Sequence, residues 1–276
     1  MFVIFAIVMA VIIAGLVAFT WTLRRMSGRV SSTPVAEPDA PKSFGYKMSW
    51  LAVKTQDTER LSRVLGIGSG RTANWADGIA SVYSEVGTDN DIFISPPVGE
   101  WTFVVGVALP HPLGASFLDK CTPLLEELSS KFGEAHYYFS FPLLDFYAWA
   151  KAVDGQMVRA FATGDEGIIW NRGRLTPEER KLNLRFFELR GISSRKGDVG
   201  GNMMLVPTEA QVLELAGRWS LDPSRLDERF ERNMADGKAQ LEDRDEWGRD
   251  DGAYEVGYLG QAPMAWRSER RQKSAA

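Results

Sequence analysis

Two charged side chains stand inside otherwise apolar stretches in the middle of the chain. Asp145 lies in FPLLDFYAW and Arg159 lies in QMVRAF, and both stretches have the composition of half-buried strands. A charge among such neighbours needs a partner. We therefore expect an ion pair that joins Arg159 to Asp145 across a sheet. The alternative is a ligand-binding site in which Trp101, Trp149 or Tyr147 supplies an aromatic wall beside the two charges.

The chain has one thiol and two imidazoles, from which a nucleophilic pair would have to be built. Cys121 would need a pKa lowered by His111, by His136 or by a helix N-terminus. It precedes a predicted helix start, but it also falls on an apolar stripe with Leu125 and Leu128, where a buried thiol is ordinary core. We favour the core interpretation. Two histidines and one cysteine are too few for a structural zinc site, so no metal or other cofactor is expected.

A glycine cluster, GIGSGR, occupies residues 66–71 and invites comparison with phosphate-binding loops. A dinucleotide fingerprint requires glycine where Arg71 stands, and it should follow a strand, whereas this cluster follows a predicted helix. We expect Gly66 to end that helix and the rest to form a loop. An anion site that uses Arg71 is the less favoured alternative.

Carboxylates are the remaining candidates for chemistry. Asp77, Asp145 and Glu166 would serve a hydrolase if the fold brought them together in a concave pocket with perturbed pKa values. A magnesium or calcium site around Asp89, Asp91, Asp165 and Glu166 is formally open. Solvation of loops explains those acids better.

Composition limits the classes of function. The net charge of -4 and the isoelectric point near 5.4 argue against a nucleic-acid binder. A single cysteine precludes an intramolecular disulfide and fits a reducing compartment. Nine tryptophans predict either a well-filled core or an exposed stacking surface. The exposure of Trp75, Trp101, Trp149 and Trp170 decides between the two.

An apolar run at residues 2–23 precedes the strands and helices that position these residues. As a helix this run measures roughly 33 Å, which is enough to cross a bilayer core. It has no basic n-region and is too long for a signal peptide, so it predicts a transmembrane anchor. Arg24, Arg25 and Arg29 follow the run. The positive-inside rule then predicts a single-pass inner-membrane protein whose N-terminus is outside and whose C-terminal domain is cytoplasmic.

Behind the anchor we expect three regions. Residues 24–45 are rich in Ser, Pro and Ala and predict a flexible linker. Residues 46–225 form a globular α+β domain with a mainly antiparallel sheet and helices packed on one side. Residues 226–276 are densely charged and predict a partly disordered tail, in which the segment beyond Asp227 is either a solvated helix or disordered and 254–259 could return as an edge strand.

Short sequence patterns predict individual strands, helices and turns within this domain. Residues 47–54 alternate as a strand, Asp57 caps a short helix, and residues 117–132 have helical spacing. Asp154-Gly155 is a strong hairpin signal. Thr176 and Thr208 each begin a capping box at the start of a helix.

Three segments carry a resemblance: NWADGI (74–79), SPPVGEWTFVVG (95–106) and FYAWAKAVDGQMVRAF (146–161). Together they resemble a set of uncharacterised bacterial proteins that share this Trp, Pro and Gly framework over most of residues 46–225. That set has no established activity, so the resemblance supplies no catalytic residues. It implies a self-contained cytosolic domain.

The sequence therefore favours a membrane-anchored, cytoplasm-facing, non-catalytic interaction or ligand-sensing module, of which an immunity-type protein is one form. The expected partners are the bilayer, through residues 2–23, and another protein; no nucleic acid is expected, and the sequence does not identify a small-molecule ligand. The alternative is a membrane-tethered enzyme, such as a hydrolase that uses carboxylates assembled by the fold.

Overall fold

The computed structural model describes residues 36–67, 70–84, 90–112, 119–164, 167–184, 207–235 and 256–266. The chain divides into two compact units, Met1–Ala36 and Glu37–Ala276, and almost all of the described residues belong to the second. The predicted anchor at residues 2–23 lies outside the described residues. Among the described residues, no helix combines the length and the apolar character needed to cross a membrane.

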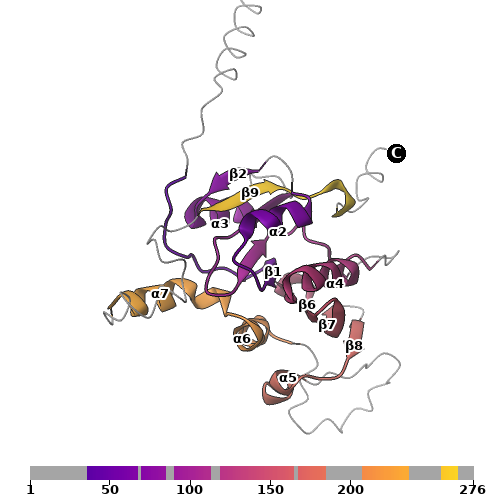
Figure 1. Ribbon diagram of the computed structural model, residues 1–276. Coiled ribbons are helices and arrows are strands. Elements are labelled where there is room, and N and C mark those ends of the chain that lie inside the picture. Colours follow the sequence, from indigo (N-terminus) through magenta and orange to yellow (C-terminus); the bar gives the residue numbers. More distant parts are fainter. Residues whose placement is uncertain are drawn as a thin grey trace, which may run out of the picture. The chain divides into compact units, whose positions relative to one another are not determined.

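Unit Glu37–Ala276 is built on one nine-stranded, fully antiparallel sheet, which confirms the α+β class (Figure 1). The strands are β1 Ser49–Val53, β2 Arg71–Ala73, β3 Asp91–Ile94, β4 Thr102–Val105, β5 Glu134–Phe141, β6 Phe146–Val153, β7 Gln156–Gly164, β8 Gly167–Gly173 and β9 Gly257–Gln261. Their order across the sheet is β2-β9-β3-β4-β1-β5-β6-β7-β8.

The helices connect or flank these strands. They are α2 Thr58–Leu65, α3 Trp75–Tyr83, α4 Cys121–Phe132, α5 Pro177–Lys181, α6 Glu209–Trp219 and α7 Leu226–Ala235, with short 3-10 helices η1 Pro142–Leu144, η2 Pro223–Arg225 and η4 Met264–Trp266. In contrast to the prediction, helices cover both faces of the sheet (Figure 1).

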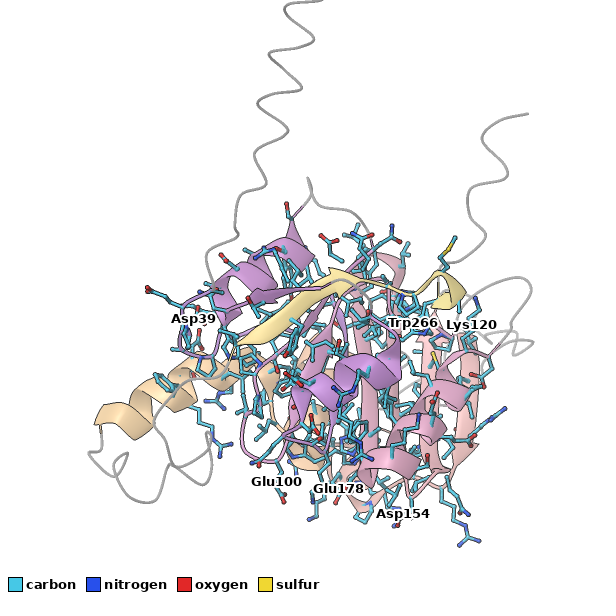
Figure 2. The ribbon with its side chains drawn as sticks, turned by 45° about the horizontal axis from the view of Figure 1, so that its top comes forward. Asp39, Glu100, Lys120, Asp154, Glu178 and Trp266 are labelled. Carbon is cyan, nitrogen blue, oxygen red and sulfur yellow. The ribbon has the colours of Figure 1, made fainter. Side chains whose placement is uncertain are left out.

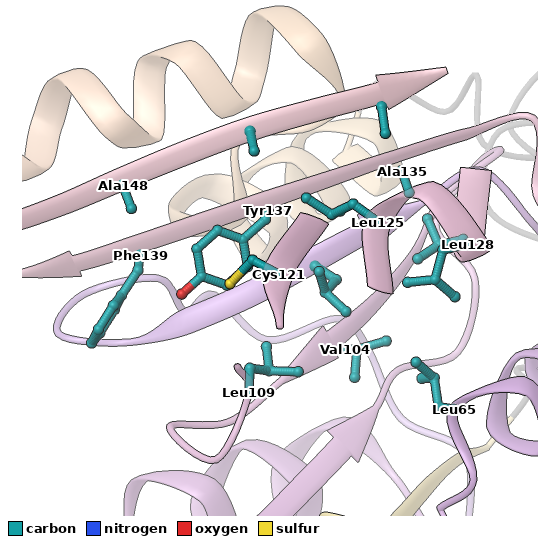
Figure 3. Packing of buried hydrophobic residues seen from close by; sticks show 14 of the residues in the cluster. Leu65, Val104, Leu109, Cys121, Leu125, Leu128, Ala135, Tyr137, Phe139 and Ala148 are labelled. Atoms are coloured by element: carbon teal, nitrogen blue, oxygen red, sulfur yellow. The ribbon is translucent and has the colours of Figure 1, made fainter. Parts of the chain in front are cut away.

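One face of the sheet, here called the aliphatic face, packs against α2 and α4. Leu125 and Leu128 of α4 and Leu65 of α2 bury their side chains against Val104 and neighbouring strand residues, as Figure 3 shows. Few side chains in this cluster carry a polar atom. Its stability rests on removal of apolar surface from water, which is non-directional.

The opposite face, here called the aromatic face, packs against α3, α6 and the residues that follow α5. Its core contains large aromatic rings, among them Trp50, Trp75, Trp149, Trp219 and Phe161. Several of these rings contact one another, as in the stack of Trp149 on Phe161, whose centroids are 4.6 Å apart. The successive residues of each strand alternate between the two faces, so one strand serves both cores.

The local predictions agree with the structure. Asp57 caps α2 by accepting from the Arg60 amide at 2.8 Å, and Gly66 ends that helix with φ of 66°. Asp154-Gly155 forms the β6–β7 turn with both residues at positive φ, and Thr176 and Thr208 each close a capping box. Each of these features depends on residues close together in the sequence, which is why the sequence predicted them.

The C-terminal tail begins with a helix, which is one of its two predicted forms. Leu226 is buried, and α7 continues from it to Ala235. The returning strand is present as β9, but it is not an edge strand: it pairs with β2 on one side and with β3 on the other. Residues 236–255 lie outside the described residues.

The flexible-linker prediction also fails for its C-terminal part. Residues Glu37 to Lys47, here called the strap, run over α3, η2 and α6, and Phe44 and Gly45 are buried. Phe44 lies among aromatic rings, with its centroid 5.3 Å from that of Phe103. Serine and proline content predicted mobility, but one buried aromatic ring and a set of hydrogen bonds hold this segment to the domain.

Candidate functional site

Arg159 forms its ion pair with Glu179 and not with Asp145. Its Nε atom lies 2.8 Å from Oε1 and 3.0 Å from Oε2 of Glu179, and both side chains are buried. Asp145 is exposed in the turn after η1, with a positive φ of 46°. The predicted Arg159–Asp145 pair is therefore wrong, because Asp145 ends a 3-10 turn at the surface and does not face the sheet.

Glu179 is also bonded to two further partners. The indole Nε1 of Trp149 donates to Oε1 of Glu179 at 2.8 Å, and the backbone amide of Thr176 donates to Oε2 at 2.8 Å. The second bond belongs to the capping box that starts α5, so helix capping and charge pairing use the same carboxylate. The sequence holds Glu179 in this position because Thr176, the N-cap residue, stands three residues before it and Pro177 begins the helix.

The guanidinium of Arg159 bonds to β8 as well. Its Nη1 atom donates to the Asn171 side-chain oxygen at 2.8 Å and to the Arg172 carbonyl at 2.9 Å. It also donates to the carbonyl of Ala160, at 2.8 Å. Arg159 thus joins β7, β8 and α5 in one network of charge-assisted bonds.

Three basic residues lie side by side on the aromatic face, and we call them the polar row. His136 of β5 is the register partner of Lys151 of β6, and Lys151 is the register partner of Arg159 of β7. Directly paired residues have side chains close together on one face of a sheet. Each end of the row has its own carboxylate: Glu179 at Arg159 and Glu134 at His136.

His136 is fully buried, and both of its ring nitrogens have partners. Nε2 lies 2.8 Å from Oε1 of Glu134, and the hydroxyl of Tyr138 lies 3.3 Å from Nδ1. An ionised carboxylate only accepts, so we assign the proton to Nε2 and the acceptor lone pair to Nδ1. Burial lowers the pKa of His136 to about 4, so the ring is neutral near pH 7.

Glu134 bridges His136 to Lys151. Lys151 Nζ lies 2.5 Å from Oε1 of Glu134, and the hydrogen bond from His136 lowers the pKa of this carboxyl to about 2. The rings of Trp101 and Trp219 lie against His136, with centroid distances of 4.9 and 5.7 Å. At the His136 end of the polar row, Glu134 is therefore paired with Lys151. The neutral imidazole of His136 lies beside this pair, between the indole rings of Trp101 and Trp219.

This arrangement suits structural pairing better than catalysis. A general base must reach a substrate proton with a free lone pair, and the Nδ1 atom of His136 faces the buried Tyr138 hydroxyl. Likewise, Arg159 and Trp149 direct N–H groups to Glu179. These two predicted ligand residues contribute to one bonded network inside the fold.

Trp75, Trp101, Trp149 and Trp170 could form an exposed stacking surface only if they lay at the surface, but all four are buried. Their exposed fractions are 1% for Trp75, 9% for Trp101, 0% for Trp149 and 3% for Trp170. The idea of an exposed stacking surface built from them is wrong. Trp101 lies against His136 and Trp149 bonds to Glu179, whereas Trp75 packs with Phe93 and Trp170 belongs to the core of the aliphatic face. These four rings fill the core and do not form a ligand platform.

Cys121 is a core thiol, as the sequence favoured. Its Sγ atom donates to the Pro110 carbonyl at 2.9 Å, and burial raises the pKa of the thiol well above its usual value. His111 is bonded elsewhere, to the Tyr137 hydroxyl at 3.1 Å and to the Val107 carbonyl at 2.7 Å. A protonated thiol is a poor nucleophile, so this cysteine does not have the chemistry of a catalytic residue.

Within the described residues, the structure keeps apart Asp77 and Asp145, two of the three proposed hydrolase carboxylates. Asp77 belongs to α3, which packs on β3 and β9, and it faces Arg71 at 3.9 Å. Asp145 lies between β5 and β6, and strands β4 and β1 separate β3 from β5. Three strand spacings amount to about 14 Å. Glu166 lies outside the described residues, and within those residues no cluster of three metal-ligating side chains occurs.

Comparisons with known proteins supply no relative. No protein-family model matches the chain, and no curated protein or solved structure matches it either. The functional argument therefore rests on the sequence and on the geometry of the described residues.

Sequence reasoning missed the residues that hold the polar row together. Glu179 was recognised as part of a capping box, but its carboxylate was not considered as the partner of Arg159. Glu134 and Trp219 were missed as partners of His136. A signal for Glu179 did exist, because a capping-box carboxylate has a known orientation and Arg159 lies on a buried strand.

Proposed function

We propose that this chain is a membrane-anchored, cytoplasm-facing, non-catalytic interaction or ligand-sensing module, of which an immunity-type protein is one form. The observation that carries the non-catalytic part is the internal bonding of the polar row. Arg159, Trp149 and Thr176 all bond to the carboxylate of Glu179, and Glu134 binds both His136 and Lys151. The charged and imidazole side chains that could act in catalysis are instead bonded to one another, and these bonds connect the strands and α5.

A surface feature supports contact with a protein partner. Leu143 and Leu144 stand next to each other in η1, and their exposed fractions are 76% and 61%. Exposed apolar side chains in adjacent positions on an ordered turn are typical of contact sites. A single exposed leucine needs no explanation, but a consecutive pair at the end of a hairpin adds support for an interaction module.

The membrane part of the proposal rests on the sequence. Residues 2–23 have the length and apolarity of a transmembrane helix, and Arg24, Arg25 and Arg29 follow on the proposed cytoplasmic side. The three segments that resemble an uncharacterised bacterial family suggest a self-contained cytosolic domain, to which this chain adds the anchor. Kinship with that family remains part of the proposal.

Labelling of engineered cysteines tests the topology. In a Cys121→Ala background, Asp154→Cys on the exposed β6–β7 turn provides one reactive thiol in the domain (Figure 2 labels Asp154). We expect a membrane-impermeant maleimide to label it only after the cells are permeabilised. Labelling in intact cells would place the domain outside and overturn the proposed orientation.

Site-specific photocrosslinking tests the interaction part. A photoreactive residue at Leu144 should form a discrete protein adduct in intact cells, and one at Asp154, an exposed turn residue, is the matched control. Adducts at both positions would indicate random collisions. Adducts at neither would contradict the proposal that η1 contacts a partner.

A further inference from the structure

The strap contacts the domain at its two ends through different chemistry. At its N-terminal end, Glu37 and Asp39 make polar contacts to the start of α3. Toward its C-terminal end, Phe44 buries a ring in the aromatic core. Between them Lys42 is exposed and Ser43 bonds to Asp227. The strap is therefore held first by a half-buried polar attachment at Asp39, then by the Ser43–Asp227 bonds, and then by a buried apolar attachment at Phe44.

Asp39 occupies the N-terminus of α3 with both carboxylate oxygens. Oδ1 accepts from the Trp75 amide at 2.7 Å, and Oδ2 accepts from the Ala76 amide at 2.9 Å (Figure 2 labels Asp39). Asn74, the N-cap residue, accepts from the Asp77 amide and donates to the Glu37 carbonyl at 3.0 Å. First-turn amides lack helical partners and favour an anion, so a carboxylate far away in the sequence is held here.

The second attachment is more deeply buried. The Phe44 amide donates to the Pro223 carbonyl at 2.9 Å, and the Phe44 ring lies 6.1 Å from Trp50 and 6.5 Å from Trp75 between centroids. The Gly45 amide donates to the Tyr83 hydroxyl at 3.0 Å, and that hydroxyl donates to the Tyr46 carbonyl. Burial raises the pKa of Tyr83 to about 12, so its hydroxyl remains a donor.

We propose that the strap is a releasable latch that opens from its N-terminal end, with Asp39 as its first point of release. Displacement of the chain before Glu37 acts on Asp39 before it acts on Phe44, because the attachments follow one another along the strap. Opening exposes the Trp75 and Ala76 amides and loosens the cover of the aromatic face. The proposal concerns unit Glu37–Ala276 and does not depend on the membrane anchor.

The latch gives the module two tether lengths. Release of residues 37–42 adds about 20 Å of extended chain before the next attachment at Ser43. A partner that pulls on the chain before Glu37 is thereby connected to the cover of the aromatic core, and this part of the inference rests on the proposed sensing function. A sensing function needs an element of this kind, with two discrete states that a remote event can bias.

Hydrogen exchange of the full chain in detergent micelles tests the latch through the Asp39→Ala variant. Loss of the carboxylate removes the partners of the Trp75 and Ala76 amides, so faster exchange there is expected of any capping residue. The latch additionally predicts about fivefold faster exchange at the Phe44 and Gly45 amides, a factor typical of a lost helix-capping carboxylate. Asp57→Ala removes the carboxylate that caps α2 and should leave these two amides unchanged.

Two results would overturn the latch. Unchanged exchange at Phe44 and Gly45, together with faster exchange at Trp75 and Ala76, would make Asp39 only a helix cap. Equally faster exchange throughout β1 and β5 would show that the strap opens only when the domain unfolds. If Asp39→Ala does not fold, Asp39→Asn keeps one acceptor oxygen, and the same comparison of amides applies to it.

Discussion

The two faces of the sheet belong to the same strands, but different interactions stabilise them. On the aliphatic face, leucines of α2 and α4 pack on Val, Ile and Ala side chains. On the aromatic face, indole and phenol rings surround His136, Arg159 and Glu179, which are buried ionisable groups. The first face depends on apolar burial, whereas the second depends on directional bonds that must all be satisfied.

This difference predicts how amino-acid substitutions on each face affect the free energy of unfolding. Apolar packing loses stability in proportion to the atoms removed and to the cavity left behind. A buried ion pair behaves otherwise, since removal of one partner leaves an uncompensated charge in the core. We therefore expect single substitutions on the aromatic face to span a wider range of effects than those on the aliphatic face.

The largest effect is expected from Glu179→Gln. This change removes the negative charge that faces the buried Arg159 and should lower the free energy of unfolding by about 3–5 kcal/mol. Urea unfolding followed by circular dichroism measures it. Glu178→Gln makes the same chemical change one residue earlier in α5 and should cost less than about 0.5 kcal/mol. Equal losses in the two variants would contradict a specific role for the Arg159–Glu179 pair.

A core substitution on the aliphatic face should cost somewhat less. Leu125→Ala removes a fully buried side chain from α4 and should lower the free energy of unfolding by about 3 kcal/mol. The exposed Leu143 offers the control, because Leu143→Ala should change stability by less than about 0.5 kcal/mol. The same urea titration distinguishes them. A small loss for Leu125→Ala would mean that α4 is not a main cover of this face.

The pH dependence separates the faces further, because His136 lies on the aromatic face. Its folded pKa of about 4 is below the usual value of 6.5, so between these pH values the unfolded chain binds a proton that the folded chain does not. Stability therefore falls as the pH falls, by about 2 kcal/mol from pH 6.5 to pH 5. Glu134, whose pKa is lowered from 4.5 to about 2, adds a further loss as the pH falls below 4.5, because the unfolded chain then binds a proton that the folded chain does not.

Unfolding free energies at pH 7, 6 and 5 test this dependence. His136→Asn should flatten the slope, and His111→Asn, which changes the other of the two histidines, should preserve it. A slope that survives in His136→Asn would assign the proton uptake to a different group.

The smallest effect is expected from Trp149→Phe. A smaller phenyl ring remains to stack on Phe161, while the indole bond to Glu179 is lost. A net cost of about 1–2 kcal/mol follows, because one charge-assisted hydrogen bond is removed and Glu179 keeps its other partners. Thermal unfolding measures the loss. A change as large as that of Glu179→Gln would mean that the ring itself, and not the bond, stabilises this region.

The sequence predicted features that depend on neighbouring residues. The cap at Asp57, the turn at Asp154-Gly155 and the capping box at Thr176 were correct because a few adjacent side chains determine each one. The buried character of Arg159 and its need for a partner were likewise evident from its apolar neighbours.

Features that depend on distant pairing were not predictable in the same way. Asp145 is nearer to Arg159 in sequence than Glu179 is, so it was the obvious partner, but it lies in an exposed turn. The insertion of β9 between β2 and β3 joins segments more than 160 residues apart. Most of the strap was taken for part of a linker because residues 24–45 are rich in Ser, Pro and Ala, although Phe44 toward its C-terminal end is buried.

The central claim is that the buried charged side chains of the aromatic face, above all Arg159 and Glu179, pair with each other and stabilise the fold. A double-mutant cycle with Arg159→Met and Glu179→Leu in the full chain tests it most directly. We predict that each single variant loses about 3–5 kcal/mol and that the double variant loses less than either, because no buried charge remains unpaired. Additive losses, or an Arg159→Met variant as stable as the parent chain, would contradict the claim.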